Sequence, residues 1–456
     1  MLTVIDPTTG KVIREVMPDT DAVVEAKLAK AAQAYIAWRT TSFSERAKVM
    51  CAVAANMRAR VAELAPIMTE EMGKPIREAR GEVEKAAWCA EHYAEHAETY
   101  LAPQVIGSDA THSYVQHLPI GPVLGILPWN APFWLAFRFC APALMAGNTC
   151  LMKHDPHVPG CAAAIADVFT QAGAPDGIFQ TLMLETPNVE RVIRDTRVRA
   201  VSFTGSGRGG SAVAAIAASE IKPAVLELGG SDPCIVLADA DLNKAADVLK
   251  VSRIINAGQS CIAAKRIIVE APVYDEMTEH LRTRFASLKM ADPREEDTDV
   301  GPIARSNLRD ELHRQISSTV AAGARCLLGG ELPKGSGFFY PVTLLADVEP
   351  GMCAYAEETF GPVGVIIRAN DAQHALSLAN DTEYGLAASV WSTPERGQAL
   401  AREIEAGQVA VNGIVKTDPR LPSGGIKKSG YGRELGPHGI HAFVNAQQVW
   451  VGPVRG

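Results

Sequence analysis

Short runs of strand-forming residues alternate with helical runs between residues 148 and 256. The strand-type runs are NTCLMKH, RAVSFTGS, AVLELGG and PCIVL, and the helical patterns cover 160–172, 210–220 and 241–256. Parallel strands need a crossover connection, which is usually a helix, so this alternation is typical of an open parallel sheet. The pattern therefore predicts an α/β fold.

A second α/β unit is expected in the later half of the chain. Strand and helix patterns follow one another in KRIIVEAPVYDEMTEHLRTRFASL and again in FGPVGVIIRAN with AQHALSLAND. We expect the boundary between the two units near Gly229 and Gly230. Upstream of both, apolar residues at helical spacing predict helices over 44–72 and 76–100, separated by GKP. A chain of 456 residues exceeds the size of one hydrophobic core, so two or three domains are expected.

The charge balance limits the classes of partner. The chain has 44 Lys and Arg against 52 Asp and Glu, a net charge of −8, which argues against a nucleic-acid-binding or polybasic membrane surface. The N-terminal stretch MLTVIDPTTGKVIREV does not resemble a secretion signal, and no run of apolar residues is long enough to predict a membrane span. We expect a cytoplasmic protein without nucleic-acid or membrane partners.

The nine cysteines are scattered along the chain without a C-x-x-C pair, so neither a disulfide framework nor a zinc site is expected. Most lie in apolar surroundings, where an unpaired cysteine is usually a small buried hydrophobe. Cys261, in GQSCIAAKR, has polar and glycine neighbours and is either another such residue or a nucleophile. His92 and His96 have the spacing of metal ligands, but the charges around them favour a solvated helix face, and we predict no metal.

The run VSFTGSGRGG contains G-x-G-x-x-G at Gly205, Gly207 and Gly210, directly after a predicted strand and at the start of a predicted helix. In this context glycines let the backbone approach a pyrophosphate, and the helix N-terminus offers unpaired N–H groups. The alternative is that they only turn the chain. Glu227, in LELGG, follows at about the distance of a ribose-binding acid, but at the end of an apolar strand it also suits a general base with a raised pKa. Spacing alone leaves both roles open.

Six motifs together resemble the aldehyde dehydrogenase superfamily over essentially the whole chain. They are PWNAPFW, FTGS with Gly210 four positions after Ser206, LELGG, GQSC, EETFGP and GGIKKSGYGRELG, in that order. The chain length and the variants MKHDPHVPG, AAKR and GYGRELGPHGIHAFVN look most like the short bacterial succinate-semialdehyde dehydrogenases. The resemblance implies a Rossmann-type cofactor domain, an α/β catalytic domain and a small β oligomerisation arm.

The resemblance implies that Cys261 is the nucleophile and attacks an aldehyde to give a thiohemiacetal and then a thioester. It makes the side-chain amide of Asn130 and the backbone N–H of Cys261 the oxyanion hole, and gives Glu227 the activation of the hydrolytic water. The expected reaction is NAD(P)-dependent oxidation of an aldehyde to a carboxylate, with succinate semialdehyde as the favoured substrate. The alternatives are another small aliphatic aldehyde or a non-catalytic structural relative.

The resemblance also implies a set of residues around NAD or NADP: Trp129, Lys153, Gly205, Ser206, Gly210, Glu358 and Phe360. Lys153 would reach the ribose on the adenine side, and Glu358 would hold the nicotinamide ribose. Many NAD-preferring members have a glutamate three residues after this lysine, where this chain has Pro156. Without that carboxylate a 2′-phosphate is not repelled, and His154 is a candidate to attract it, so use of NADP becomes plausible.

For a substrate carboxylate, the resemblance implies Arg138, eight residues after Asn130, with help from Ser429. An ion pair inside the fold remains the alternative for Arg138. A second arginine found in longer relatives, six positions before the cysteine, is Ile255 here.

The expected domain organisation follows the same resemblance. Residues 1–103 and 120–229 form the dinucleotide-binding domain, and 230–417 form the catalytic domain. Residues 104–119 and 418–456 form the oligomerisation arm and the C-terminal tail, and a homodimer or homotetramer is expected.

Overall fold

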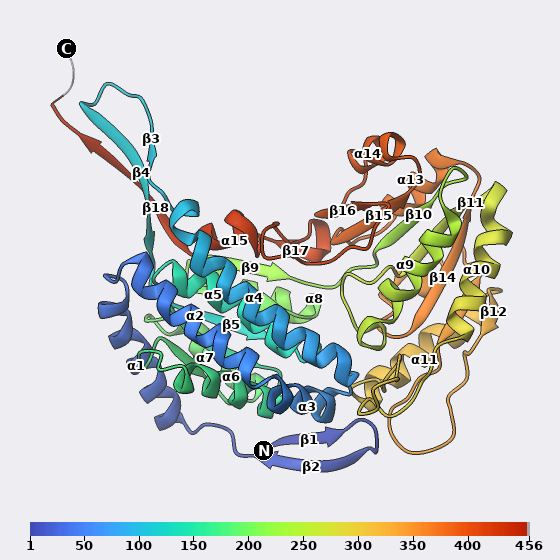
Figure 1. Ribbon diagram of the computed structural model, residues 1–456, viewed down its shortest axis with the longest axis horizontal. Coiled ribbons are helices and arrows are strands. Elements are labelled where there is room, and N and C mark those ends of the chain that lie inside the picture. Colours follow the sequence, from blue (N-terminus) through green and yellow to red (C-terminus); the bar gives the residue numbers. More distant parts are fainter. Residues whose placement is uncertain (454–456) are drawn as a thin grey trace.

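The computed structural model describes residues 1–453 and contains two large, mainly parallel sheets side by side (Figure 1). The first has the order β17-β9-β8-β5-β6-β7. Its strands are β5 (Pro122–Leu127), β6 (Thr149–His154), β7 (Phe179–Thr181), β8 (Ala200–Thr204), β9 (Ala224–Glu227) and β17 (Gly430–Tyr431). The strand order reverses between β5 and β8, which makes their carboxyl ends the expected ligand crevice of this sheet.

The second sheet has the order β12-β13-β14-β11-β10-β15-β16. Its strands are β10 (Pro233–Val236), β11 (Arg266–Glu270), β12 (Arg325–Leu328), β13 (Thr343–Ala346), β14 (Val363–Ala369), β15 (Ala387–Trp391) and β16 (Gln408–Val411). The chain passes from the first sheet to the second between β9 and β10, around the predicted boundary at Gly229 and Gly230. The predicted α/β fold with parallel sheets is confirmed.

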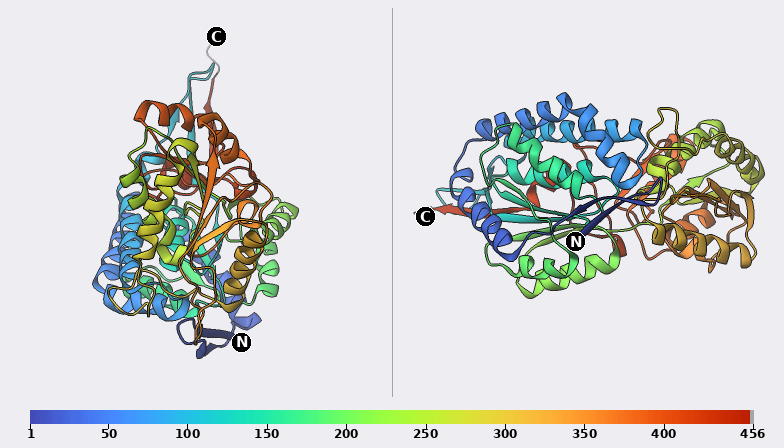
Figure 2. Two further views of the ribbon diagram at one scale, coloured as in Figure 1. Left: turned by 90° about the vertical axis from the view of Figure 1, so that its right-hand side faces the viewer. Right: turned by 90° about the horizontal axis from the view of Figure 1, so that it is seen from below.

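Helices cover both faces of each sheet (Figure 2). In β5, Val123 and Leu127 pack with α2–α6, whereas Leu124 and Ile126 pack with α1, α7 and α8, as the two-residue period of a strand requires. The helices around the first sheet are α1 (Asp21–Trp38), α2 (Phe43–Ala59), α3 (Val61–Met72), α4 (Ile76–Tyr100), α5 (Pro132–Met145), α6 (Pro159–Gln171), α7 (Val189–Arg194) and α8 (Gly207–Ser219).

Around the second sheet, α9 and α10 cover one face and α11–α13 the other. The remaining helices of the described chain are α9 (Leu242–Ile254), α10 (Tyr274–Ala286), α11 (Ser306–Ala321), α12 (Cys353–Ala356), α13 (Ala372–Asn380), α14 (Pro394–Ala401) and α15 (Gly436–His441). No helix within residues 1–453 is long and apolar enough to cross a membrane.

The single helix predicted over 44–72 is wrong, because the chain leaves the helical conformation at Arg60. The backbone there has φ −111° and ψ 15°, and α2 ends and α3 begins on either side of it. Arg60 is an ordinary helix-forming residue, and the nearest helix-breaking signal, Pro66, lies six positions later inside α3.

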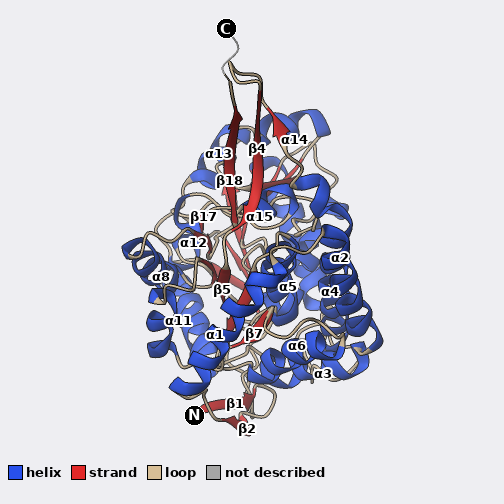
Figure 3. Ribbon diagram, turned by 90° about the vertical axis from the view of Figure 1, so that its left-hand side faces the viewer, coloured by secondary structure: helices blue, strands red, loops and turns tan. Residues whose placement is uncertain are grey.

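Two small sheets complete the fold. β3 (Gln104–Val105), β4 (His112–Pro119) and β18 (Val444–Val451) form an antiparallel sheet that projects from the body (Figure 3). Near the N-terminus, β1 (Leu2–Asp6) and β2 (Lys11–Val16) form a hairpin.

Candidate active site

Cys261 follows a tight turn after α9 in which three consecutive residues adopt left-handed backbone angles. The φ values are 56° at Asn256, 53° at Ala257 and 74° at Gly258. Non-glycine residues in this region cost about 1–3 kcal/mol each and persist only where the surroundings hold them. Here the Asn256 N–H donates to Glu78 Oε2 at 2.6 Å, so a partly buried carboxylate holds the turn that presents the cysteine.

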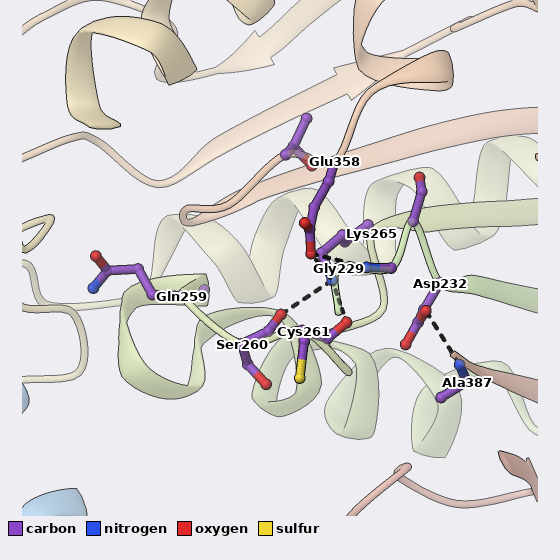
Figure 4. A network of polar contacts seen from close by, with 12 residues as sticks. Gly229, Asp232, Gln259, Ser260, Cys261, Lys265, Glu358 and Ala387 are labelled. Carbon is purple, nitrogen blue, oxygen red and sulfur yellow. Dashed lines mark hydrogen bonds and ion pairs between the residues drawn. The ribbon is translucent and has the colours of Figure 1, made fainter. Parts of the chain in front are cut away.

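A buried ammonium ties the Cys261 loop to a carboxylate in the loop between α12 and β14 (Figure 4). Lys265 Nζ donates to the carbonyls of Ser260 at 3.0 Å and Cys261 at 2.5 Å, and lies 3.3 Å from Glu358 Oε1. Glu358 Oε1 also accepts the Gly230 N–H at 3.1 Å. Lys265 lies in the AAKR variant, but no role was predicted for it from the sequence.

The thiol of Cys261 is surrounded by charges of both signs. Burial raises its pKa to about 11, the cations Lys265 and Arg138 act to lower it, and the carboxylates of Glu358 and Glu227 act to raise it. The group is therefore a neutral thiol near pH 7, and its sulfur becomes a nucleophile only when that proton is lost.

Glu227 ends β9 as a buried carboxyl group. Burial raises its pKa to about 7, against the lowering effect of Arg138, while Glu434 adds to the rise. Its Oε1 has no hydrogen-bond partner within the described chain. A pKa near 7 and a free oxygen suit proton exchange near neutral pH.

Arg138, from α5, is buried between two carboxylates. Its Nη2 lies 3.2 Å from Glu227 Oε2 and 2.5 Å from Glu434 Oε2. These contacts match the ion pair that the sequence analysis kept as the alternative to substrate binding. Glu434, in the C-terminal GYGRELG motif, had no predicted role and reaches the site only through the tertiary fold.

Ser429 is also buried, and its hydroxyl donates to the Gly229 carbonyl at 2.7 Å and accepts the Gly385 N–H at 3.0 Å. The hydroxyl proton is therefore used within the protein. This arrangement favours support of the turn after Glu227 over the predicted contact with a substrate.

Asn130 lies between β5 and α5 and faces the cysteine loop. Its side-chain Nδ2 donates to the Gln259 carbonyl at 3.1 Å. Its backbone carbonyl accepts hydrogen bonds from Lys74 Nζ at 2.9 Å and Asn256 Nδ2 at 2.8 Å. An amide nitrogen carries two hydrogens, so one remains for a substrate oxygen. The backbone of Asn130 is held by Lys74 and Asn256 and its side-chain amide by Gln259, so the amide can serve as a preorganised donor.

The Asn130 segment is further fixed by Glu82 on α4. Its Oε1 accepts the N–H groups of Phe133 at 2.9 Å and Trp134 at 3.2 Å, which lie in the first turn of α5. Its other oxygen pairs with Lys74, the lysine of the GKP stop. The sequence analysis read GKP only as a helix end.

Replacing Asn130 with alanine should lower kcat by about a hundredfold or more, because one oxyanion donor contributes about 3 kcal/mol in a preorganised site. Steady-state kinetics would measure the loss, and an unchanged dinucleotide Kd would show that the variant is folded. A change confined to KM would contradict the oxyanion role.

The glycine turn after β8 opens α8 at the point where the sheet order reverses. Ser206 caps the helix by accepting the Gly209 N–H at 3.2 Å. A Cβ on Gly210 would lie 2.5 Å from Leu228 Cδ2, so glycine permits the close packing of helix and strand, whereas Gly207 faces open space. Open glycine backbone at an exposed helix N-terminus fits a pyrophosphate.

Other residues predicted for the cofactor lie along the same crevice. The side chain of Lys153 is buried near the end of β6, its amine makes no hydrogen bond or ion pair within residues 1–453, and burial lowers its pKa. The rings of Trp129 and Phe360 contact each other edge to face, with their centroids 5.9 Å apart. An unpaired lysine and two aromatic rings beside the glycine turn fit a dinucleotide.

Two histidines differ from expectation. His154 is buried, its Nε2 lies 3.0 Å from the Pro132 carbonyl, and burial lowers its pKa to about 4, so the ring is neutral near pH 7 and offers no positive charge to a phosphate. His92 is not on a solvated face: it is buried, stacks on His96 and contacts Tyr100 Oη at 3.1 Å. No group of metal-ligating side chains was found within residues 1–453.

The fold and site define an α/β protein with a thiol, an amide donor and a carboxyl group of raised pKa beside a glycine turn. The chain belongs to the aldehyde dehydrogenase family, whose model matches residues 1–449, as the sequence motifs predicted.

Relatives match almost the whole chain. A probable NADP(+) succinate-semialdehyde dehydrogenase of Synechocystis sp. is 46% identical, covering 98% of this chain and 99% of that protein. An NAD(P)+ succinate semialdehyde dehydrogenase of Escherichia coli K12 is 45% identical, covering 98% and 97%. The crystal structure of succinic semialdehyde dehydrogenase from Streptococcus pyogenes, in complex with NADP+, superimposes with a TM-score of 0.96 at 35% identity, covering 98% and 99%.

Proposed function

We propose that this protein oxidises succinate semialdehyde to succinate with NADP or NAD as the electron acceptor. The observation that carries the proposal is the convergence of Cys261, Asn130 and Glu227 with a buried cation, Arg138, at one site. The relatives named succinate-semialdehyde dehydrogenases, at about 45% identity over nearly the whole chain, support the choice of substrate.

Each residue has a distinct part in this reaction. The thiol of Cys261 loses its proton to solvent, and the sulfur adds to the aldehyde carbon. The remaining N–H of the Asn130 amide and the Cys261 backbone N–H stabilise the oxyanion. A bound nicotinamide dinucleotide supplies the hydride acceptor. Glu227 then takes a proton from the water that hydrolyses the thioester, which releases the carboxylate product and returns the thiol.

For the cofactor, we propose that Ser206 and the glycine turn bind the pyrophosphate, Lys153 binds the adenine-side ribose, and Glu358 binds the nicotinamide ribose. Glu358 is already oriented by Lys265 and the Gly230 N–H. A carboxylate can accept both hydroxyls of a ribose diol. The turn after β6 carries Pro156 and no acidic residue at that position, which supports use of NADP.

Replacing Pro156 with glutamate should shift cofactor preference toward NAD by about fivefold or more, because a carboxylate a few ångströms from a 2′-phosphate repels it by at least about 1 kcal/mol. The ratio of kcat/KM for NADP and NAD measures the shift. Pro156→Ala is the matched control, since it removes the ring without adding charge. An unchanged ratio in Pro156→Glu would show that this position does not face the ribose.

We also propose the domain roles and assembly expected from the sequence. The unit around the first sheet binds the dinucleotide, the second carries the nucleophile, and the sheet β18-β4-β3 is an arm that joins subunits into a dimer or tetramer. The arm exposes Val105, Ile106, Trp450 and Val451, which supports burial against a second copy. All nine cysteines are free, which fits a thiol enzyme of the reducing cytoplasm.

A panel of aldehydes with and without a terminal carboxylate, assayed with both dinucleotides, tests the proposed function. We expect kcat/KM for succinate semialdehyde to exceed that for butyraldehyde, which has the same chain length and no charge, by at least about tenfold. Equal values would remove the substrate assignment and leave an enzyme for small aliphatic aldehydes.

A further inference from the structure

Lys85, on α4, carries a largely buried ammonium beside the candidate active site. Its Nζ donates to Thr417 Oγ1 at 3.0 Å and lies 4.2 Å from the centre of the Trp134 ring. It makes no ion pair within residues 1–453, in contrast to Lys74 and Lys265, which each pair with a carboxylate. A buried cation without a counter-ion is costly, and an anionic ligand would relieve that cost.

The packing of α4 on α5 places Lys85 alongside the reacting groups. Glu82, one helical turn before Lys85, binds the N-terminal N–H groups of α5, and Lys85 packs on Trp134 in the same turn. Along the chain, Asn130, Trp134 and Arg138 are spaced four residues apart, so the latter two share one face of α5. Lys85 therefore borders the stretch of α5 between the oxyanion donor and Arg138.

The positive charge of Arg138 is already shared by two carboxylates, Glu434 at 2.5 Å and Glu227 at 3.2 Å. A substrate carboxylate placed on Arg138 alone would bring a third negative group to one cation. Electroneutrality in a buried site therefore calls for a second cation, and the unpaired ammonium of Lys85 meets that need.

We propose that Lys85, assisted by the hydroxyl of Thr417, binds the distal carboxylate of the semialdehyde substrate and sets the preference for charged aldehydes. This inference rests on the proposed function, since it assigns a residue to that substrate. Trp134 would pack on the aliphatic part of the Lys85 side chain. An uncharged aldehyde would gain nothing from the ammonium.

Replacement of Lys85 with methionine tests the proposal, because methionine keeps most of the volume and removes the charge. We expect kcat/KM for succinate semialdehyde to fall by at least about tenfold, the usual size of a charge-assisted contact, and kcat/KM for butyraldehyde to change less than about twofold. Lys85→Arg should recover part of the loss. Lys48→Met, which removes an exposed lysine of α2, is the matched control and should change neither value.

The pH dependence of the ratio of the two kcat/KM values gives a second readout, because groups common to both reactions cancel. Burial lowers the pKa of Lys85 to about 8, with Arg138 acting in the same direction and Glu82, Cys89 and Asp418 acting against it. The ammonium loses its charge as the pH rises through that value. The ratio should therefore fall above about pH 8 in the wild type and stay flat in Lys85→Met.

The outcomes separate the two proposals. If the wild type prefers succinate semialdehyde and Lys85→Met keeps that preference, the role of Lys85 is overturned and the function stands. Equal losses on both aldehydes would also overturn it, since Lys85 would then only support the fold. If the wild type has no preference, the proposed substrate fails and the role of Lys85 fails with it.

Discussion

Replacing Cys261 with alanine should abolish aldehyde oxidation and leave dinucleotide binding nearly unchanged. The thiol forms the covalent bond to the aldehyde carbon, so no other group can replace it. The proposed dinucleotide contacts come from other residues, with Ser206 and Lys153 in the first unit and Glu358 in the second. Steady-state turnover and the Kd for NADP, measured on the same preparation, would check both parts.

Cys51→Ala is the matched control, because Cys51 is an exposed cysteine on α2 and its loss should leave turnover unchanged. Turnover by Cys261→Ala above about one part in a thousand of the wild-type rate would contradict a covalent role for this residue.

Replacing Glu227 with glutamine should preserve much of the initial burst of reduced cofactor and slow steady-state turnover by about a hundredfold or more, because the thioester then waits for an activated water. Glutamine keeps the shape of the side chain and an oxygen acceptor for Arg138. Rapid-mixing measurements would separate the burst from the steady state.

The pH profile adds to this test. Because the raised pKa of Glu227 is about 7 and the base acts when deprotonated, wild-type kcat should rise as the pH increases through about 7. The rise should disappear in Glu227→Gln. A large increase in the Kd for the dinucleotide, with no burst, would instead support the ribose role that the glycine fingerprint first suggested for this residue.

The alternation of strand and helix patterns was sufficient to predict the parallel sheets, because buried parallel strands and crossover helices leave a strong local signal. The break at Arg60 left no signal at its own position, since a helix-forming residue occupies it and the nearest proline, Pro66, lies inside α3. The left-handed angles at Asn256 and Ala257 were equally hidden, because the long-range bond to Glu78 and the packing around it hold them.

The candidate site could be predicted only where its residues lie in motifs. Cys261 stood out by its polar neighbours, whereas Glu434 meets Arg138 through the fold, and no local pattern joins them. Lys85 lies in an ordinary amphipathic helix, and only the packing of α4 on α5 shows that its ammonium is unpaired beside the site. Residues whose role depends on such long-range contacts need the structure.

Trapping of the covalent intermediate tests the central claim most directly. Glu227→Gln would be mixed with succinate semialdehyde and NADP, quenched in acid within the burst, digested and analysed by mass spectrometry. The account predicts one succinyl group on the peptide that carries Cys261, in an amount matching the reduced cofactor formed. Reduction of the cofactor with no acyl group on that peptide, or with the group on another cysteine, would contradict it.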